Sequence, residues 1–317
     1  MSIAPHAEDA FAERAHLLQH IQRLLPSDQG ETSPLPADLL SYPGFISHAY
    51  EISADLAPAA DLAEVRRHAD ASAARTKVSP CSAWAVDLPA REPHSAATLQ
   101  RAIQQLDSLI STGHRVDVTI AQWSDQERRT FCAASCFLAE HWPAMLDELR
   151  HTVRQVTLLD GVGIAGFSNI TAHGVIFLNR QRLRAGSDGL PGVLRLLEGL
   201  VHEGTHNRYN AADLHTPFLI PGTGAQAPVV QTPLRPDPRP LMGLFQQLIV
   251  LVRCIELYAR FTAAATNGTA IQDRQAVLSR QAYEAYAECE KHRALLTDAG
   301  AQILADAFHR LNTSPTT

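Results

Sequence analysis

The chain has 317 residues, of which 45% are hydrophobic and 19% are charged, and its formal net charge is −6. This length and apolar content are enough for a large buried core, in one domain or two closely packed ones. A negative chain without clustered Lys and Arg argues against nucleic-acid binding. The longest apolar run, residues 248–254, is too short to span a bilayer, and the N-terminal residues lack the regions of a signal peptide. We therefore expect a cytoplasmic protein with no membrane partner.

Hydrophobic periodicity predicts a mainly α fold with a small antiparallel β-sheet, which is an α+β class. The predicted helices cover residues 7–25, 54–74, 95–112, 124–153, 190–206, 241–262 and a helical pair within 273–311. The predicted strands are 155–159 and 174–178, and Pro-rich loops are predicted at 26–36 and 216–240. We divide the chain into a helical N-terminal region, 1–150, and a metal-binding catalytic region, 151–317, with one continuous domain as the alternative.

Three glycines after the first predicted strand match the G-x-G-x-x-G pattern of dinucleotide-binding proteins, at Gly161, Gly163 and Gly166. That pattern binds a pyrophosphate only where the last glycine opens a helix whose N-terminus faces the phosphates. Here the residues after Gly166 lead through a polar turn into a second strand. The sequence therefore does not predict a nucleotide site.

The five cysteines are odd in number and include no C-x-x-C pair, so they predict neither a disulfide framework nor a zinc ribbon. Cys132 and Cys136 are four residues apart in a predicted helix, a spacing that directs two thiols to the same side. We interpret them as small buried helix residues, which is the more common role of such cysteines.

The most informative motif is H-E-x-x-H, formed by His202, Glu203 and His206 inside an apolar helical run. Histidines four residues apart lie on one face of a helix, so two ring nitrogens can point at one metal ion. Glu203 lies about 100° around the helix from His202, close enough to act as acid or base or to orient a ligand. The motif predicts a metal site.

Two histidines need a third ligand, and Glu256 is our choice because it lies on a predicted helix that is otherwise almost entirely apolar. The alternative is that Glu256 forms an ion pair with Arg253 or Arg260, at i−3 and i+4. Asp213 and His215, shortly after the motif, are rival ligands.

Two reactions fit two histidines and a carboxylate. With zinc, and Glu203 as general base, the site would be that of a metallohydrolase or peptidase. With iron(II), the same ligands form the 2-His-1-carboxylate arrangement of non-haem oxygenases. A structural metal in a chain without enzymatic activity is a third possibility. The spacing of the ligands does not distinguish these.

Three stretches in order, residues 174–179, 200–206 and 235–241, followed by the helix that carries Glu256, resemble the HExxH-motif peptide-modification family. This family is associated with 2-oxoglutarate-dependent peptide β-hydroxylases, and the resemblance covers about residues 155–262. It implies an iron(II) enzyme that uses O2 and 2-oxoglutarate to hydroxylate an unactivated carbon, the β carbon, of an amino acid or peptide residue. His202 and His206 carry over as iron ligands, with Glu256 as the third.

The resemblance also implies a cosubstrate site and a fold. Arg235 or Arg239 would bind the distal carboxylate of 2-oxoglutarate, because a guanidinium group matches a carboxylate with two hydrogen bonds. Their alternative role is a surface turn held by Asp237. Glu203 would orient a ligand or a water. By analogy we expect a zincin-like metal helix within a helical bundle. A free amino acid, a carrier-bound one and a peptide are all candidate substrates.

Overall fold

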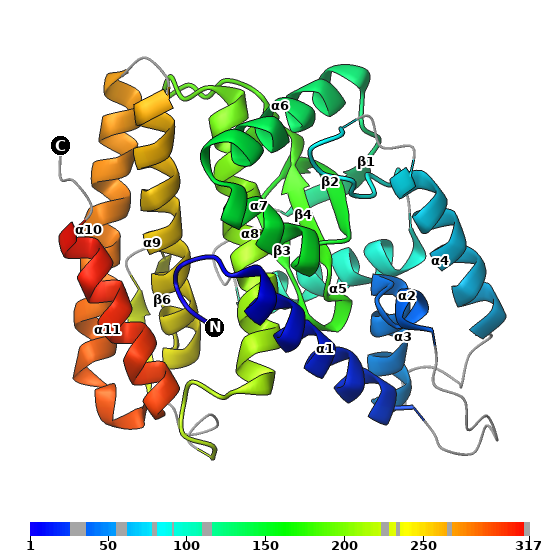
Figure 1. The fold of residues 1–317 in the computed structure, drawn as a ribbon, viewed down its shortest axis with the longest axis horizontal. Coiled ribbons are helices and arrows are strands. Elements are labelled where there is room, and N and C mark those ends of the chain that lie inside the picture. Colours follow the sequence, from blue (N-terminus) through cyan, green and yellow to red (C-terminus); the bar gives the residue numbers. More distant parts are fainter. Residues whose placement is uncertain are drawn as a thin grey trace.

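The computed structural model describes residues 1–25, 36–54, 62–77, 81–90, 92–109, 116–222, 228–232, 235–264 and 268–313. Within these ranges the chain is mostly helical, with one four-stranded and one two-stranded sheet (Figure 1). The helices are α1 (Ala7–Arg23), α2 (Ala37–Leu40), α3 (Pro43–Ser53), α4 (Leu62–Lys77), α5 (Pro93–Leu109), α6 (Asp125–His141), α7 (Pro143–Thr152), α8 (Gly192–His215), α9 (Leu241–Ala264), α10 (Thr269–Lys291) and α11 (Asp298–Thr313). Short 3-10 helices are η1 (Ile170–Ala172), η2 (Arg180–Leu183) and η3 (Arg293–Leu295). The strands are β1 (Asp117–Ala121), β2 (Gln155–Val162), β3 (Gly166–Ser168), β4 (Val175–Asn179), β5 (Val229–Thr232) and β6 (Arg235–Pro240). The mainly α fold with a small sheet is confirmed.

The central element is α8, which contains the H-E-x-x-H motif and is buried along most of its length. Figure 1 shows the sheet β1–β4 on one side of α8 and the C-terminal helices α9, α10 and α11 on the other. Gly204, inside the motif, lets α7 pack closely, because a Cβ atom there would lie 2.1 Å from Cδ2 of Leu149. The H-E-x-x-H motif therefore lies where the sheet layer and the helical layer meet.

The four-stranded sheet has the order β1-β2-β4-β3 and is mixed. The two strands that we predicted, β2 and β4, are neighbours, but they are parallel, with Gln155 opposite Val175 and Leu159 opposite Asn179. The expectation of a purely antiparallel sheet is therefore wrong. The reason lies in the glycine-rich segment between them, which contains β3, antiparallel to β4. Since the chain reverses direction twice between β2 and β4, these two strands run the same way.

The predicted helix 124–153 is two helices, α6 and α7, with a break at Trp142. Pro143 explains the break, because proline lacks an N–H group and disfavours helical backbone in the residue before it. Trp142 accordingly has φ −151° and ψ 60°, outside the helical region. The predicted helix 54–74 corresponds to α4, which begins at Leu62, and a further helix, α3, lies before it in the chain. Residues 55–61 of the predicted helix lie outside the described residues.

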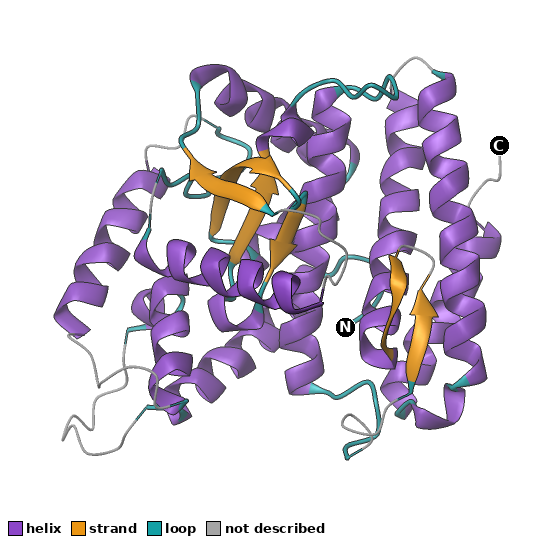
Figure 2. Cartoon of the chain, turned by 180° about the vertical axis from the view of Figure 1, so that it is seen from behind, coloured by secondary structure: helices purple, strands orange, loops and turns teal. Residues whose placement is uncertain are grey.

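The predicted loop 216–240 contains a β-hairpin, β5–β6, which is a second correction. Figure 2 shows this hairpin beside the C-terminal helices, apart from the main sheet. In β6 prolines alternate with other residues, at Pro236, Pro238 and Pro240. Proline is compatible with an edge strand provided that its nitrogen faces away from the partner strand. The proline content that predicted a loop therefore belongs to an edge strand.

A buried ion cluster joins three helices. Glu148 of α7 accepts hydrogen bonds from Arg208 of α8 and from Arg253 of α9, the latter at 2.6 Å from Nη1. The three side chains are fully buried. Because buried charges are tolerated only when they are paired, this cluster fixes α8 relative to α7 and α9.

The helix α9 is 24 residues long and apolar enough by length and composition to cross a membrane. In the structure 72% of its most hydrophobic 18-residue window is buried inside the protein. Its apolar character is accounted for by packing against α8 and α10.

Candidate metal centre

The two motif histidines lie side by side on α8. The rings of His202 and His206 have centroids 4.9 Å apart and an interplanar angle of 63°. Both side chains are half-buried, as expected for groups at the boundary between a packed helix and an open space. The four-residue spacing therefore brings the two imidazoles together on one face, as predicted.

His202 opens into a cavity of about 700 Å³. The cavity lies between the glycine-rich segment and β3 on one side and the helices α8, α9 and α10 on the other. Its lining residues that carry polar or reactive groups are Gln105, Ser168, Asn169, Arg182, Glu198, His202, Glu203, Arg239, Cys254 and Arg274. His206 is not among the residues that line it. A volume of this size is typical of small-molecule sites.

Glu203 lines the same cavity and is held from the sheet side. Its side chain is buried, and Ser168 Oγ on β3 donates a hydrogen bond to Glu203 Oε2 at 3.2 Å. Gly166 permits this approach, because a Cβ atom at that position would lie 3.1 Å from Glu203 Oε1 and 3.0 Å from the carbonyl oxygen of Phe177. The third glycine of the G-x-G-x-x-G pattern thus begins a strand beside a carboxylate, not a helix beside a phosphate.

Glu198, one helical turn before His202, is a cavity residue that the sequence reasoning missed. It accepts hydrogen bonds from Tyr258 at 2.6 Å and from Arg274 at 2.6 Å. Burial alone would raise the pKa of Glu198, but the hydrogen bonds from Arg274 and Tyr258, together with the charges of Arg274 and Arg182, outweigh burial and lower the pKa. The signal available in the sequence was its spacing of four residues from His202 on the same apolar helix.

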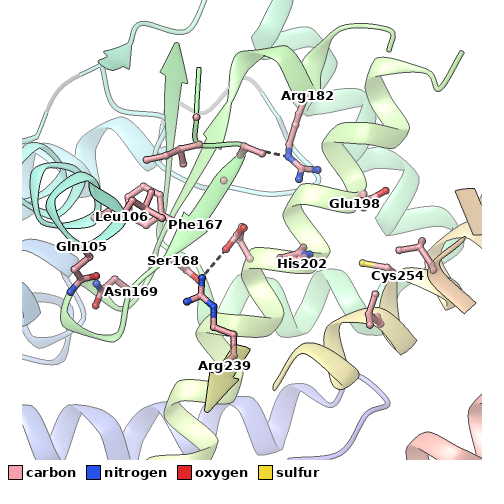
Figure 3. A pocket seen from close by; sticks show the side chains of 18 of the residues that line it. Gln105, Leu106, Phe167, Ser168, Asn169, Arg182, Glu198, His202, Arg239 and Cys254 are labelled. Carbon is pink, nitrogen blue, oxygen red and sulfur yellow. Dashed lines mark hydrogen bonds between the residues drawn. The ribbon is translucent and has the colours of Figure 1, made fainter. Parts of the chain in front are cut away.

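Two further arginines reach the cavity from different elements. Arg239 lies on β6 and Arg182 on η2, where its Nε donates to the carbonyl oxygen of Ala165 at 3.1 Å. Figure 3 shows these two arginines at opposite ends of the cavity, with His202 between them. The structure thus brings one of the two predicted carboxylate-binding arginines to the motif. The side chain of Arg235 lies outside the described residues.

Glu256, the predicted third ligand, is not among the cavity residues. Cys254 faces the cavity, and a residue two positions further along a helix points to roughly the opposite side. Glu256 accepts a hydrogen bond from Arg310 of α11 at 2.6 Å and forms an ion pair with Arg260 at 3.5 Å. The ion-pair alternative therefore describes its surroundings, with Arg260 as one partner, while Arg253 pairs with Glu148 instead.

The rival ligands also lie elsewhere. Asp213, near the end of α8, accepts a hydrogen bond at 3.0 Å from the backbone N–H of Phe218 in the loop that follows this helix. The ring of His215 lies against His16 of α1, with centroids 4.7 Å apart. Neither residue lines the cavity at His202.

Neither a scan of protein-family models nor a search of curated proteins finds a match to this chain.

These residues fit a metal ion only in part. Two imidazoles at i and i+4 are a suitable pair of ligands for zinc or iron(II). A set of three His, Cys, Asp or Glu residues with donor atoms within 4.8 Å of one another occurs once among the described residues. It is formed by Cys81, Cys132 and Cys136, outside this cavity. α8 thus offers a pair of adjacent histidines, of which His202 opens into the cavity, and a neighbouring buried carboxylate. Within the described residues no third protein ligand is assembled beside them.

Proposed function

We propose that this chain is a non-haem iron(II), 2-oxoglutarate-dependent oxygenase that hydroxylates an unactivated carbon of an amino acid or peptide residue. The observation that carries the proposal is that His202, Glu203 and Arg239 line one cavity. These residues come from two of the segments on which the family resemblance rests, and nearly 40 positions separate them in the sequence. A zincin-like arrangement of the motif helix is part of the proposal, supported by the packing of α8 on β3 and β4.

In this proposal His202 and His206 hold the iron, and Arg239 binds a carboxylate of the cosubstrate through its guanidinium group. Bound iron(II) would supply the activation of O2 that hydroxylation of an unactivated carbon requires. Glu203, fixed by Ser168, orients a water or holds a proton next to His202. Arg182, at the other end of the cavity, is a second guanidinium group that can bind a carboxylate of the amino acid or peptide substrate.

We leave Glu256 out of the proposed ligand set. To act as a ligand, Glu256 would have to break its charge-assisted hydrogen bond with Arg310. Its side chain would also have to move to the opposite side of α9 to reach the cavity. The two histidines would then hold the iron, and the cosubstrate and solvent would supply its remaining ligands.

The experiment is metal analysis of protein purified without oxygen, followed by titration with 2-oxoglutarate under iron(II). We expect near-stoichiometric iron and a visible charge-transfer band that is lost in His202→Ala and in His206→Ala. His309→Ala, a change of an exposed histidine on α11, should leave the band intact. Arg239→Ala should raise the 2-oxoglutarate concentration needed for the band, whereas the exposed Arg129→Ala should not.

A zinc hydrolase is the second candidate, because the buried carboxylate of Glu203 faces the same cavity as His202. A carboxylate beside a zinc-bound water is the arrangement of a general base in H-E-x-x-H peptidases. Full zinc occupancy with no response to iron and 2-oxoglutarate would favour this candidate and overturn the oxygenase. Glu203→Gln should then abolish peptide hydrolysis while the zinc is retained.

A further inference from the structure

Three cysteines converge at α6, outside the cavity that His202 lines. The sulfur atoms of Cys81, Cys132 and Cys136 all lie within 4.8 Å of one another. Cys132 and Cys136 are one turn apart on α6, and Cys81 comes from the segment before α5, about 50 residues earlier in the chain. None of the five cysteines of the chain is disulfide-bonded in the structure.

The cluster is preorganised by contacts around it. Cys81 is 2% exposed and its thiol lies 3.9 Å from the carbonyl oxygen of Cys132, as a weak S–H donor. Three residues later, Trp84 packs on Phe131 of α6, with ring centroids 5.4 Å apart. The same segment is tied to the helices by Arg150, which donates to the carbonyl oxygen of Ala83. The segment therefore cannot move away from α6 without breaking several contacts.

The cluster also has a path from solvent, because exposure increases along it. Cys81 is buried, Cys132 is half-buried and Cys136 is exposed. Core packing would explain a buried cysteine but not an exposed one directed at two others. A group of three thiols open at one end is instead suited to a soft cation.

We infer that Cys81, Cys132 and Cys136 bind one divalent d10 cation of the zinc type, as three thiolates with a solvent molecule in the fourth position. A zinc–sulfur distance of about 2.3 Å in tetrahedral geometry places the sulfur atoms about 3.8 Å apart. The observed separations, at most 4.8 Å, therefore need to contract by about 1 Å or less. On binding, the three thiols release three protons to solvent, and the complex carries one net negative charge.

The site is tested by titrating the reduced full-length chain with Cd2+ and following the ultraviolet band of thiolate-to-metal charge transfer. Histidine and carboxylate ligands do not produce this band, so the H-E-x-x-H motif does not interfere. We expect one Cd2+ per chain to saturate the band. Cys132→Ser should remove most of it, and Cys136→Ser should weaken it and lower the Cd2+ affinity at least tenfold. The band should persist in His202→Ala, which separates this result from that of the proposed oxygenase.

Cys289→Ala is the control, because Cys289 is a buried cysteine on α10 outside the cluster. It should keep the full band. Because Cys136 is exposed, Cys136→Ser should fold normally, and thermal unfolding without metal should match that of the wild type. Cd2+ should then raise the midpoint of the wild type by more than that of the variant. Absence of a thiolate band in the wild type, or an undiminished band in Cys132→Ser, would overturn the inference.

Discussion

Replacing Glu148 by glutamine should strongly destabilise the protein, because Glu148 neutralises two buried arginines at the point where α7, α8 and α9 meet. It accepts hydrogen bonds from Arg208 and from both terminal nitrogens of Arg253. Glutamine keeps the volume but removes the charge, and its amide N–H groups face guanidinium N–H groups. The substitution Glu148→Gln therefore leaves two buried positive charges with a repulsive neighbour.

The expected magnitude follows from the burial of all three groups. Removing one partner of a fully buried ion pair costs about 3–5 kcal/mol, since the remaining charge stays in a low-dielectric surrounding. Arg208 keeps its contact with Glu13 at 3.1 Å, which argues for the lower half of that range. With an unfolding entropy of about 2.1 cal/mol/K per residue, a chain of 317 residues would lose roughly 4–6 °C in its thermal midpoint.

The assay is urea unfolding and thermal melting followed by circular dichroism. Glu140→Gln is the matched control, because this carboxylate on α6 has a side chain 76% exposed, next to His141. The control should change the free energy of unfolding by less than about 0.5 kcal/mol. If Glu148→Gln behaved like the control, the argument that this cluster fixes the motif helix would be refuted.

Three further changes test other parts of the structure. Gly166→Ala should lower stability by about 1–3 kcal/mol, because the added methyl group crowds Glu203, while the exposed helical change Gly243→Ala should be neutral or stabilising in the same urea titration. Glu256→Gln should cost about 1–3 kcal/mol through its lost contact with α11 and leave the iron content unchanged; loss of iron would restore it as a ligand. Burial lowers the pKa of His94 from 6.5 to about 4, so below pH 6.5 the unfolded chain takes up a proton that the folded protein does not. The stabilisation of the folded state by neutral His94 is therefore complete above pH 6.5 and falls by about 1.4 kcal/mol per pH unit down to pH 4. In His94→Gln the slope of unfolding free energy against pH over this window should be shallower, and an unchanged slope would contradict the assignment.

The sequence predicts best those features that depend on neighbours in the chain. The helices around the motif follow from apolar periodicity, and the juxtaposition of His202 and His206 follows from helix geometry alone. The prediction that Arg239 shares a site with the motif histidines came from the family resemblance, and the structure places Arg239 on the cavity that His202 lines. The break at Pro143 was readable from the sequence and was overlooked.

Features that depend on distant segments were not predictable in this way. Glu256 looked like a ligand because its helix is apolar, yet its partner Arg310 comes from a helix more than 50 residues later. Likewise, Cys132 and Cys136 looked like ordinary helix residues because nothing in their own segment reveals that Cys81 packs against them. The parallel pairing of β2 and β4 depends on β3, whose three residues carry no periodic signal.

The prolines of β6 have a consequence for how the protein can associate. The backbone N–H of Leu241 donates to the carbonyl oxygen of Pro228 on the β5 side. Because backbone groups alternate along a strand, the N–H of Arg239, two residues earlier and opposite Val230, also faces β5. In the regular part of the ladder, where Val230 is opposite Arg239, Pro238 and Pro240 then occupy the outer edge and supply no hydrogen-bond donor. This edge cannot template an incoming strand, so the β6 side of the hairpin is protected from edge-to-edge aggregation. A peptide that reaches the cavity must do so without adding a strand to β6.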